Sequence, residues 1–82
     1  MPDYIDIETI LHEILLELEL IGTEQEINAQ TNIRNDLGLD EFEIIELTGA
    51  VEAEYGININ TDEAELAQTI GQYVELIQRN LQ

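Results

Sequence analysis

The sequence predicts an all-α domain: a bundle of three longer helices and one short helix, with a long loop between the first and second. Three stretches repeat apolar residues at the i, i+3, i+4, i+7 spacing of a helix that buries one face. Residues that cap helices flank these stretches. The alternating stretch Ile57–Asn60 is too short to build a sheet and has no partner. With 82 residues, the chain is expected to form a single domain over 1–82.

The first helix is predicted from about Tyr4 to Ile21. Asp3 or Asp6 can cap its start, and Gly22 can end it in the left-handed conformation. His12 falls beside the apolar stripe and is expected to be an ordinary surface histidine. The stripe itself consists of Ile7, Ile10, Leu11, Ile14, Leu15, Leu18 and Ile21.

A polar segment without helical periodicity follows, from Thr23 to Leu39. Its few apolar residues, Ile27, Ile33 and Leu37, are expected to attach it to the core. Loops of this length inside a compact domain are uncommon and often functional.

The second helix is predicted to begin after Asp40, an N-cap residue that forms a capping box with Glu43. Gly56 can end the helix, and Phe42 and Ile45 are expected to widen its buried stripe. The stripe is formed by Ile44, Leu47, Thr48, Val51 and Tyr55. The remaining surface is acidic and carries Glu41, Glu43, Glu46, Glu52 and Glu54.

A short helical turn is predicted next, capped by Thr61 or Asp62 and running to about Ala67. The last helix begins near Thr69. Its apolar stripe consists of Ile70, Tyr73, Val74, Ile77 and Leu81.

The charge balance restricts the function. Nineteen acidic residues face only two basic ones, which gives a net charge of -17. Such a chain has almost nothing to neutralise phosphates, so nucleic acid and anionic membranes are excluded as partners. A basic patch on another protein, or cations, would be favoured. Self-association is disfavoured, so a monomer is expected.

The residue types needed for catalysis are nearly absent. The chain has no cysteine, no serine and one histidine, so nucleophilic catalysis lacks its usual groups and no enzyme activity is expected. No signal peptide or membrane span is recognisable, which favours the cytoplasm. The stretch Asn35–Glu46 has the length of a calcium-binding loop, but Leu37 and Leu39 occupy ligand positions and its glycine is misplaced. No metal site is therefore predicted.

The stretch from Asp36 to Gly56 carries a recognisable pattern. Asp36-Leu37-Gly38 is followed, two residues later, by Glu41-Phe42 and then by an acidic helix that ends in Glu54-Tyr55-Gly56. This pattern resembles the acyl carrier protein and peptidyl carrier protein family, which has Asp-Leu-Gly, two residues, Ser-Leu and an acidic helix. Further matching features are Ile27, Thr31, Ile33, Glu46-Leu47, Glu52, Ile59, Thr61–Ala67 and Thr69-Ile70.

The resemblance implies a four-helix bundle of the acyl-carrier type. In that family the serine carries a 4'-phosphopantetheine arm, whose thiol holds an acyl or peptidyl group. The acidic second helix docks onto basic patches of acyl- or peptidyl-processing enzymes. By position, the docking carboxylates of this chain would be Asp36, Asp40, Glu46, Glu52 and Glu54. The core and acyl cavity would be lined by Ile33, Leu47, Val51, Ile59, Ala64 and Ala67.

The attachment position departs from the family, because Glu41 stands where the serine should be. A carboxylate attacking the same phosphorus would form a mixed anhydride, which water breaks readily. Thr48, the only serine or threonine on this helix, lies on its apolar stripe. Three hypotheses remain open. The chain is a carrier for fatty-acid, polyketide or nonribosomal-peptide synthesis with a variant site; it is a cargo-free adaptor in which Glu41 imitates the phosphate; or it is an acidic divalent-cation-binding protein.

Overall fold

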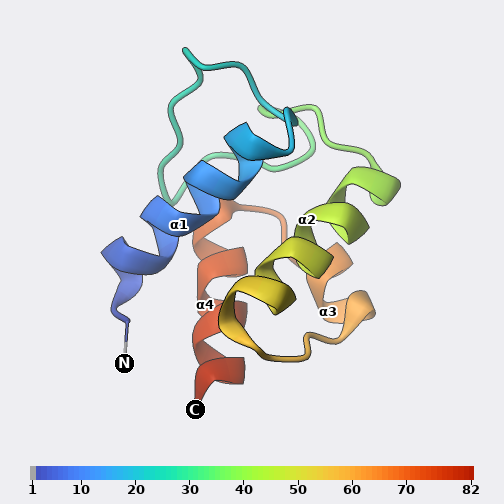
Figure 1. Cartoon of the computed structure of the whole chain (residues 1–82). Helices are drawn as coiled ribbons and strands as arrows, with labels where there is room; N and C mark the ends of the chain where they lie inside the picture. The colour runs from blue at the N-terminus through green and yellow to red at the C-terminus, as the bar shows by residue number, and fades with distance from the viewer. Residues whose placement is uncertain (1) are drawn as a thin grey trace.

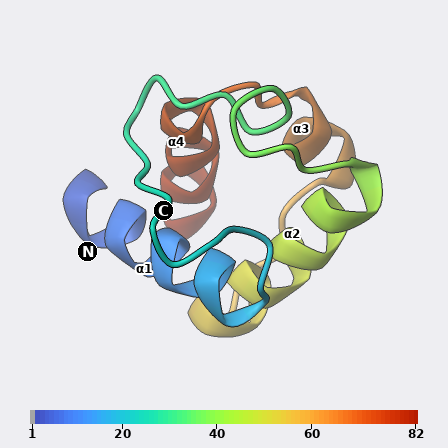
Figure 2. The same ribbon diagram turned by 90° about the horizontal axis from the view of Figure 1, so that it is seen from above.

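The computed structural model describes residues 2–82 and folds them into four helices (Figure 1). These are α1 (Tyr4–Glu17), α2 (Glu41–Tyr55), α3 (Thr61–Leu66) and α4 (Ile70–Leu81). The helical class, the order of the helices and the short third helix are as predicted. Seen from above, the helices form a ring in which α1 and α3 each pack against both α2 and α4 (Figure 2). Consequently, α2 and α4 face each other across the centre of the bundle.

Each helix contributes apolar residues to one shared core. The predicted stripes of α1, α2 and α4 supply most of its fully buried side chains, and α3 supplies Ala64. Leu76 of α4 is also buried, at 2% exposure, although it lies outside the predicted stripe. The apolar faces therefore meet in the middle, and the remaining faces carry the charge.

The first helix ends four residues earlier than predicted, at Glu17, and Gly22 does not cap it. Glu19 instead adopts the left-handed conformation, with φ of 59°. The Glu19 N–H donates to the Leu16 carbonyl at 3.0 Å, and the Leu20 N–H donates to the Leu15 carbonyl at 3.0 Å. This pair of bonds is the Schellman motif, which satisfies the last carbonyl groups of a helix.

The other helix ends agree with the sequence except for one cap. Asp3 caps α1, as expected, and α4 begins directly after Thr69, which is its N-cap. Gly56 ends α2 at φ of 65°, also as expected. The prediction that Thr61 or Asp62 caps α3 was wrong: the Asn60 side chain accepts the Glu63 N–H at 3.1 Å.

The long loop is held to the rest of the fold by backbone hydrogen bonds. The Ile33 N–H donates to the Gln68 carbonyl at 2.9 Å, and the Ile70 N–H donates to the Thr31 carbonyl at 2.9 Å. Between them, Asn32 and Thr69 form an isolated antiparallel bridge. These bonds join the loop to the α3–α4 connection, while Ile33 is buried and Ile27 and Leu37 pack against the core, as predicted.

His12, expected to be an ordinary surface histidine, also has a structural role. It is half-buried, and its Nε2 donates to the Gln25 carbonyl across 2.9 Å, which ties the first part of the loop to α1. In the described part of the chain, none of the helices is long and apolar enough to cross a membrane.

Candidate functional site

The site begins where the loop turns into α2. Gly38 adopts a left-handed φ of 71°, a conformation that favours glycine, and the next residue, Leu39, is buried. Asp40 then caps the helix: its Oδ1 accepts the Glu43 N–H at 2.8 Å, and the Glu43 carboxylate accepts the Asp40 N–H at 3.0 Å. This predicted capping box presents Glu41 as the first residue of the helix, exposed to solvent.

The surroundings of Glu41 come from two other parts of the chain. A hydrogen bond with the Glu41 carboxyl group and the negative charge of Glu41 raise the pKa of Glu65 in α3. Asp62 acts in the same direction, whereas Arg34 of the loop lowers this pKa. Arg34 also reaches α3 directly, since its Nη2 donates to the Glu65 carbonyl at 3.5 Å. Neither Arg34 nor Glu65 stood out in the sequence as part of the site.

Two large apolar side chains beside Glu41 are exposed. Phe42 is 80% exposed and Ile45 is 43% exposed, so the prediction that they widen the buried stripe was wrong. Ile44, Leu47, Thr48 and Val51 already fill the inward arc of the helix, and neighbouring positions turn away from the core. The start of α2 therefore presents apolar surface next to carboxylates.

The five carboxylates expected to dock differ in their surroundings. Glu46 and Glu54 are exposed on α2, and exposed Asp40 is the helix cap. Asp36 accepts the Asn32 N–H at 2.8 Å through Oδ2 and stabilises the turn before the helix. Glu52 is half-buried, and its Oε2 accepts the Ile59 N–H at 2.8 Å, which fixes the α2–α3 connection.

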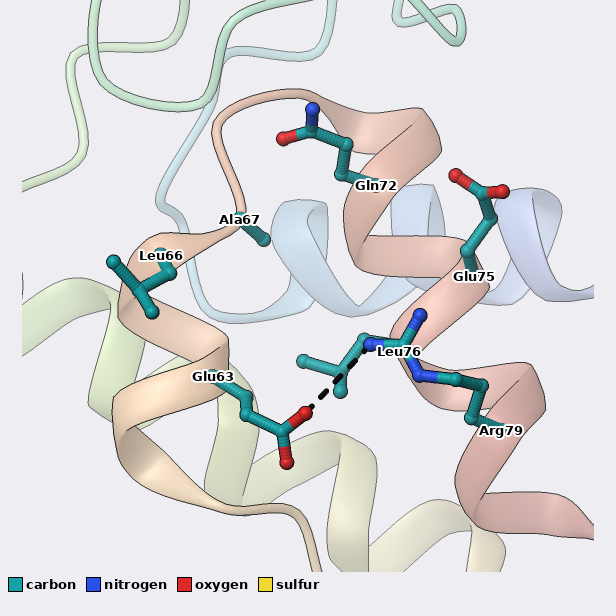
Figure 3. A pocket seen from close by; sticks show the side chains of 7 residues that line it. All are labelled: Glu63, Leu66, Ala67, Gln72, Glu75, Leu76 and Arg79. Atoms are coloured by element: carbon teal, nitrogen blue, oxygen red, sulfur yellow. Dashed lines mark ion pairs between the residues drawn. The ribbon is translucent and has the colours of Figure 1, made fainter.

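The six residues expected to line the core and acyl cavity are all buried, and each is at most 8% exposed: Ile33, Leu47, Val51, Ile59, Ala64 and Ala67. A concave pocket of about 350 Å³ lies elsewhere, open to solvent between α3 and α4 (Figure 3). Of the six, it includes only Ala67. An ion pair of 3.8 Å between exposed Arg79 and Glu63 spans this pocket, and both residues belong to its lining.

A residue that carries phosphopantetheine needs a reactive hydroxyl group, and α2 does not offer one. Thr48 is only 5% exposed, and its Oγ1 donates to the Ile44 carbonyl at 2.8 Å. Its hydroxyl is therefore buried and already committed. Glu41, which the family resemblance predicts at the attachment position, carries a carboxylate, and a carboxylate does not fit the usual phosphodiester link.

The acidic groups do not gather into a metal centre. Within residues 2–82, no three His, Cys, Asp or Glu side chains come close enough together to hold a metal ion. The geometry thus offers no support for the divalent-cation hypothesis.

Comparisons with known proteins agree with this geometry. Residues 8–77 match the family model described as phosphopantetheine attachment site. The chain is 34% identical over 74 residues to Acyl carrier protein 2 of Pseudomonas aeruginosa, which covers 89% of this chain and 91% of that protein. It is 41% identical over 56 residues to an acyl carrier protein of Amoebophilus asiaticus, covering 68% of this chain and 70% of that relative.

The family model spans most of the chain, including all of α2 and α3, and 4'-phosphopantetheine is the cofactor of that family. The fold, the capped start of α2 and the similarity agree: this chain belongs to the acyl carrier protein family.

Proposed function

We propose that this chain is a carrier-protein module with a variant attachment site at Glu41, and that it docks onto basic partner enzymes through its acidic second helix. The observation that carries the proposal is the surface at the start of α2, where exposed Phe42 and Ile45 adjoin Glu41 and Glu46. Partially exposed apolar side chains rimmed by charge are typical of protein–protein contact sites.

The charge of the molecule favours this kind of partner. At a net charge of -17, long-range attraction would speed encounter with a basic surface and would exclude acidic competitors. Among the docking carboxylates, Glu46 and Glu54 are the best placed to meet a partner because they project from the exposed face of α2. Asp36 and Glu52 also bond the backbone, so we assign them a supporting role in shaping the surface.

A second candidate function is a cargo-free adaptor in which Glu41 imitates the phosphate of a loaded carrier. The observation that favours it is the lack of any serine, together with the buried and committed hydroxyl of Thr48. In this form the chain would keep its docking surface while carrying nothing.

The partners we propose are acyl- or peptidyl-processing enzymes of fatty-acid, polyketide or nonribosomal-peptide synthesis. The whole chain would act as one domain and as a monomer in the cytoplasm, without catalytic activity of its own.

The test is a loading assay with coenzyme A and a promiscuous phosphopantetheinyl transferase, followed by intact mass. We expect Glu41→Ser to gain the mass of one arm, because the rest of the motif is retained. A wild-type chain that stays unmodified would support the adaptor, whereas a wild-type chain that gains the arm would overturn it. If Glu41→Ser also stays unmodified, the carrier role itself is contradicted.

The same assay tests the docking surface when charge reversals are added to Glu41→Ser. Glu46→Lys should slow loading several-fold at low salt, and the difference should shrink as salt screens the charges. The matched control is Glu13→Lys, which makes the same change in net charge on an exposed position of α1. Equal loading rates for the two reversals would contradict the assignment of docking to α2.

A further inference from the structure

A tyrosine occupies the centre of the bundle. Tyr73 of α4 has no exposed surface and is the largest of the fully buried side chains. Its hydroxyl lies 2.7 Å from Thr48 Oγ1 of α2. Because α2 and α4 face each other across the bundle (Figure 2), this contact joins two opposite helices of the ring.

The hydrogens of this contact can be assigned by counting donors. Thr48 has one hydroxyl hydrogen, and its Oγ1 donates to the Ile44 carbonyl at 2.8 Å. Tyr73 must then donate its own hydrogen to Thr48 Oγ1. The result is a continuous chain from the Tyr73 hydroxyl through Thr48 to the backbone of α2. Every polar group in it is satisfied, so the tyrosine is fixed in place.

The position of Tyr73 matters for any cargo chain that would enter the bundle. An apolar chain attached at the start of α2 is unfavourable in water and is stabilised wherever it can leave water. The interior of the bundle is the dry environment nearest to it. Here the interior between α2 and α4 holds an aromatic ring, and protein interiors are close-packed with little spare space.

We propose that Tyr73 is a specificity-determining residue that closes the interior of this carrier to an apolar cargo chain. Any cargo would then remain outside the bundle, which suits polar or peptidyl groups better than long acyl chains. This inference rests on the proposed carrier function, but the closed interior can be tested without any cargo.

The first experiment uses the unloaded protein with benzene, which has the size of the ring that Tyr73→Ala removes. We expect benzene to leave the Tm of the wild type and of Tyr73→Phe unchanged, and to raise the Tm of Tyr73→Ala, because only the alanine variant offers an apolar cavity. Methyl NMR signals of Thr48, Leu47 and Val51 should shift only in Tyr73→Ala. If that variant does not fold, Tyr73→Leu replaces it.

Two outcomes would overturn the proposal. One is benzene uptake by the wild type, which would show an interior that is already open. The other is the absence of uptake by both Tyr73→Ala and Tyr73→Leu, which would show that this residue is not what closes it.

The second experiment loads Glu41→Ser with octanoyl-phosphopantetheine and compares it with the unacylated arm. The octanoyl chain should leave the interior methyl signals unchanged in this background and shift them when Tyr73→Ala is added. Interior shifts without Tyr73→Ala would contradict the proposal. Failure of Glu41→Ser to load would count against the proposed function alone, since the benzene measurement needs no arm.

Discussion

The carboxylate of Glu41 has one favourable electrostatic interaction, with the helix end, and one unfavourable interaction, with Glu65. A carboxylate in the first turn of a helix is stabilised by the positive helix end, by about 0.3–1 kcal/mol. The same carboxylate lies beside Glu65 of α3, whose pKa it raises. The helix end thus stabilises the Glu41 carboxylate, while the neighbouring carboxylate of Glu65 repels it.

Tyr73 is the residue at which burial has the largest effect on ionisation. Burial raises its pKa to about 12, and the charge of Glu52 adds to the shift. The native state thus keeps the phenol protonated at pH values where an unfolded chain ionises. By linkage, stability falls as the pH rises whenever the unfolded state binds fewer protons than the native state.

We predict an alkaline loss of stability that Tyr73→Phe reduces. From its ordinary pKa of 10.0 to about 12, Tyr73 should contribute a loss of about 2–3 kcal/mol to the wild type. This stability is present below pH 10 and disappears between pH 10 and 12. Urea unfolding across this range measures it. Tyr4 and Tyr55 shift in the same direction and remain in both proteins, so parallel curves for wild type and Tyr73→Phe would contradict the assignment.

At the scale of single helices, the spacing of apolar residues correctly predicted where the longer helices lie and which face of each is buried. Apolar residues at helical spacing identify faces that must be buried, so α1, α2 and α4 were found together with most of their buried residues. The capping box at Asp40 was likewise predictable because its two residues, Asp40 and Glu43, lie only three positions apart in the sequence. The exposure of Phe42 and Ile45 was not predictable. The sequence shows that both residues are apolar, but it does not show that other residues of α2 already occupy the whole face that contacts the core.

Contacts between segments that are far apart in the chain also could not be predicted from the sequence. The approach of Arg34 and Glu65 to the start of α2, and the hydrogen bond from Tyr73 to Thr48, arise only when the bundle closes. The family resemblance predicted an attachment position at Glu41 and docking carboxylates on α2, and both stay predictions. It did not indicate that Glu52 bonds the Ile59 backbone or that Asp36 stabilises a turn.

The early end of α1 leads to a prediction for Glu19. A left-handed conformation is unfavourable for residues other than glycine, and a negative charge near a helix C-terminus is unfavourable as well. Glu19→Gly should therefore raise the free energy of unfolding by about 1 kcal/mol, or the Tm by about 4–8 °C. Glu19→Ala is the control, because it removes the charge but keeps the strained backbone. A glycine variant no more stable than the alanine variant would contradict this explanation.

For the whole molecule, size and charge together determine how strongly the carboxylates repel one another. The fold measures 31 × 24 × 21 Å and carries a net charge of -17. The Debye length is about 30 Å at 0.01 M salt and about 10 Å at 0.1 M. At low salt each carboxylate interacts with nearly every other, whereas at higher salt only close neighbours remain coupled. Self-repulsion of this kind destabilises the compact state.

Salt should therefore stabilise the protein, and the way it does so separates screening from specific cation binding. We expect the Tm to rise by several degrees from 0.01 M to about 0.5 M NaCl, because screening weakens repulsion in the native state more than in the expanded unfolded chain. CaCl₂ at matched ionic strength should give a similar curve, since residues 2–82 form no group of three metal-ligating side chains. A stoichiometric rise that saturates at sub-millimolar calcium would contradict screening and would establish a cation site instead.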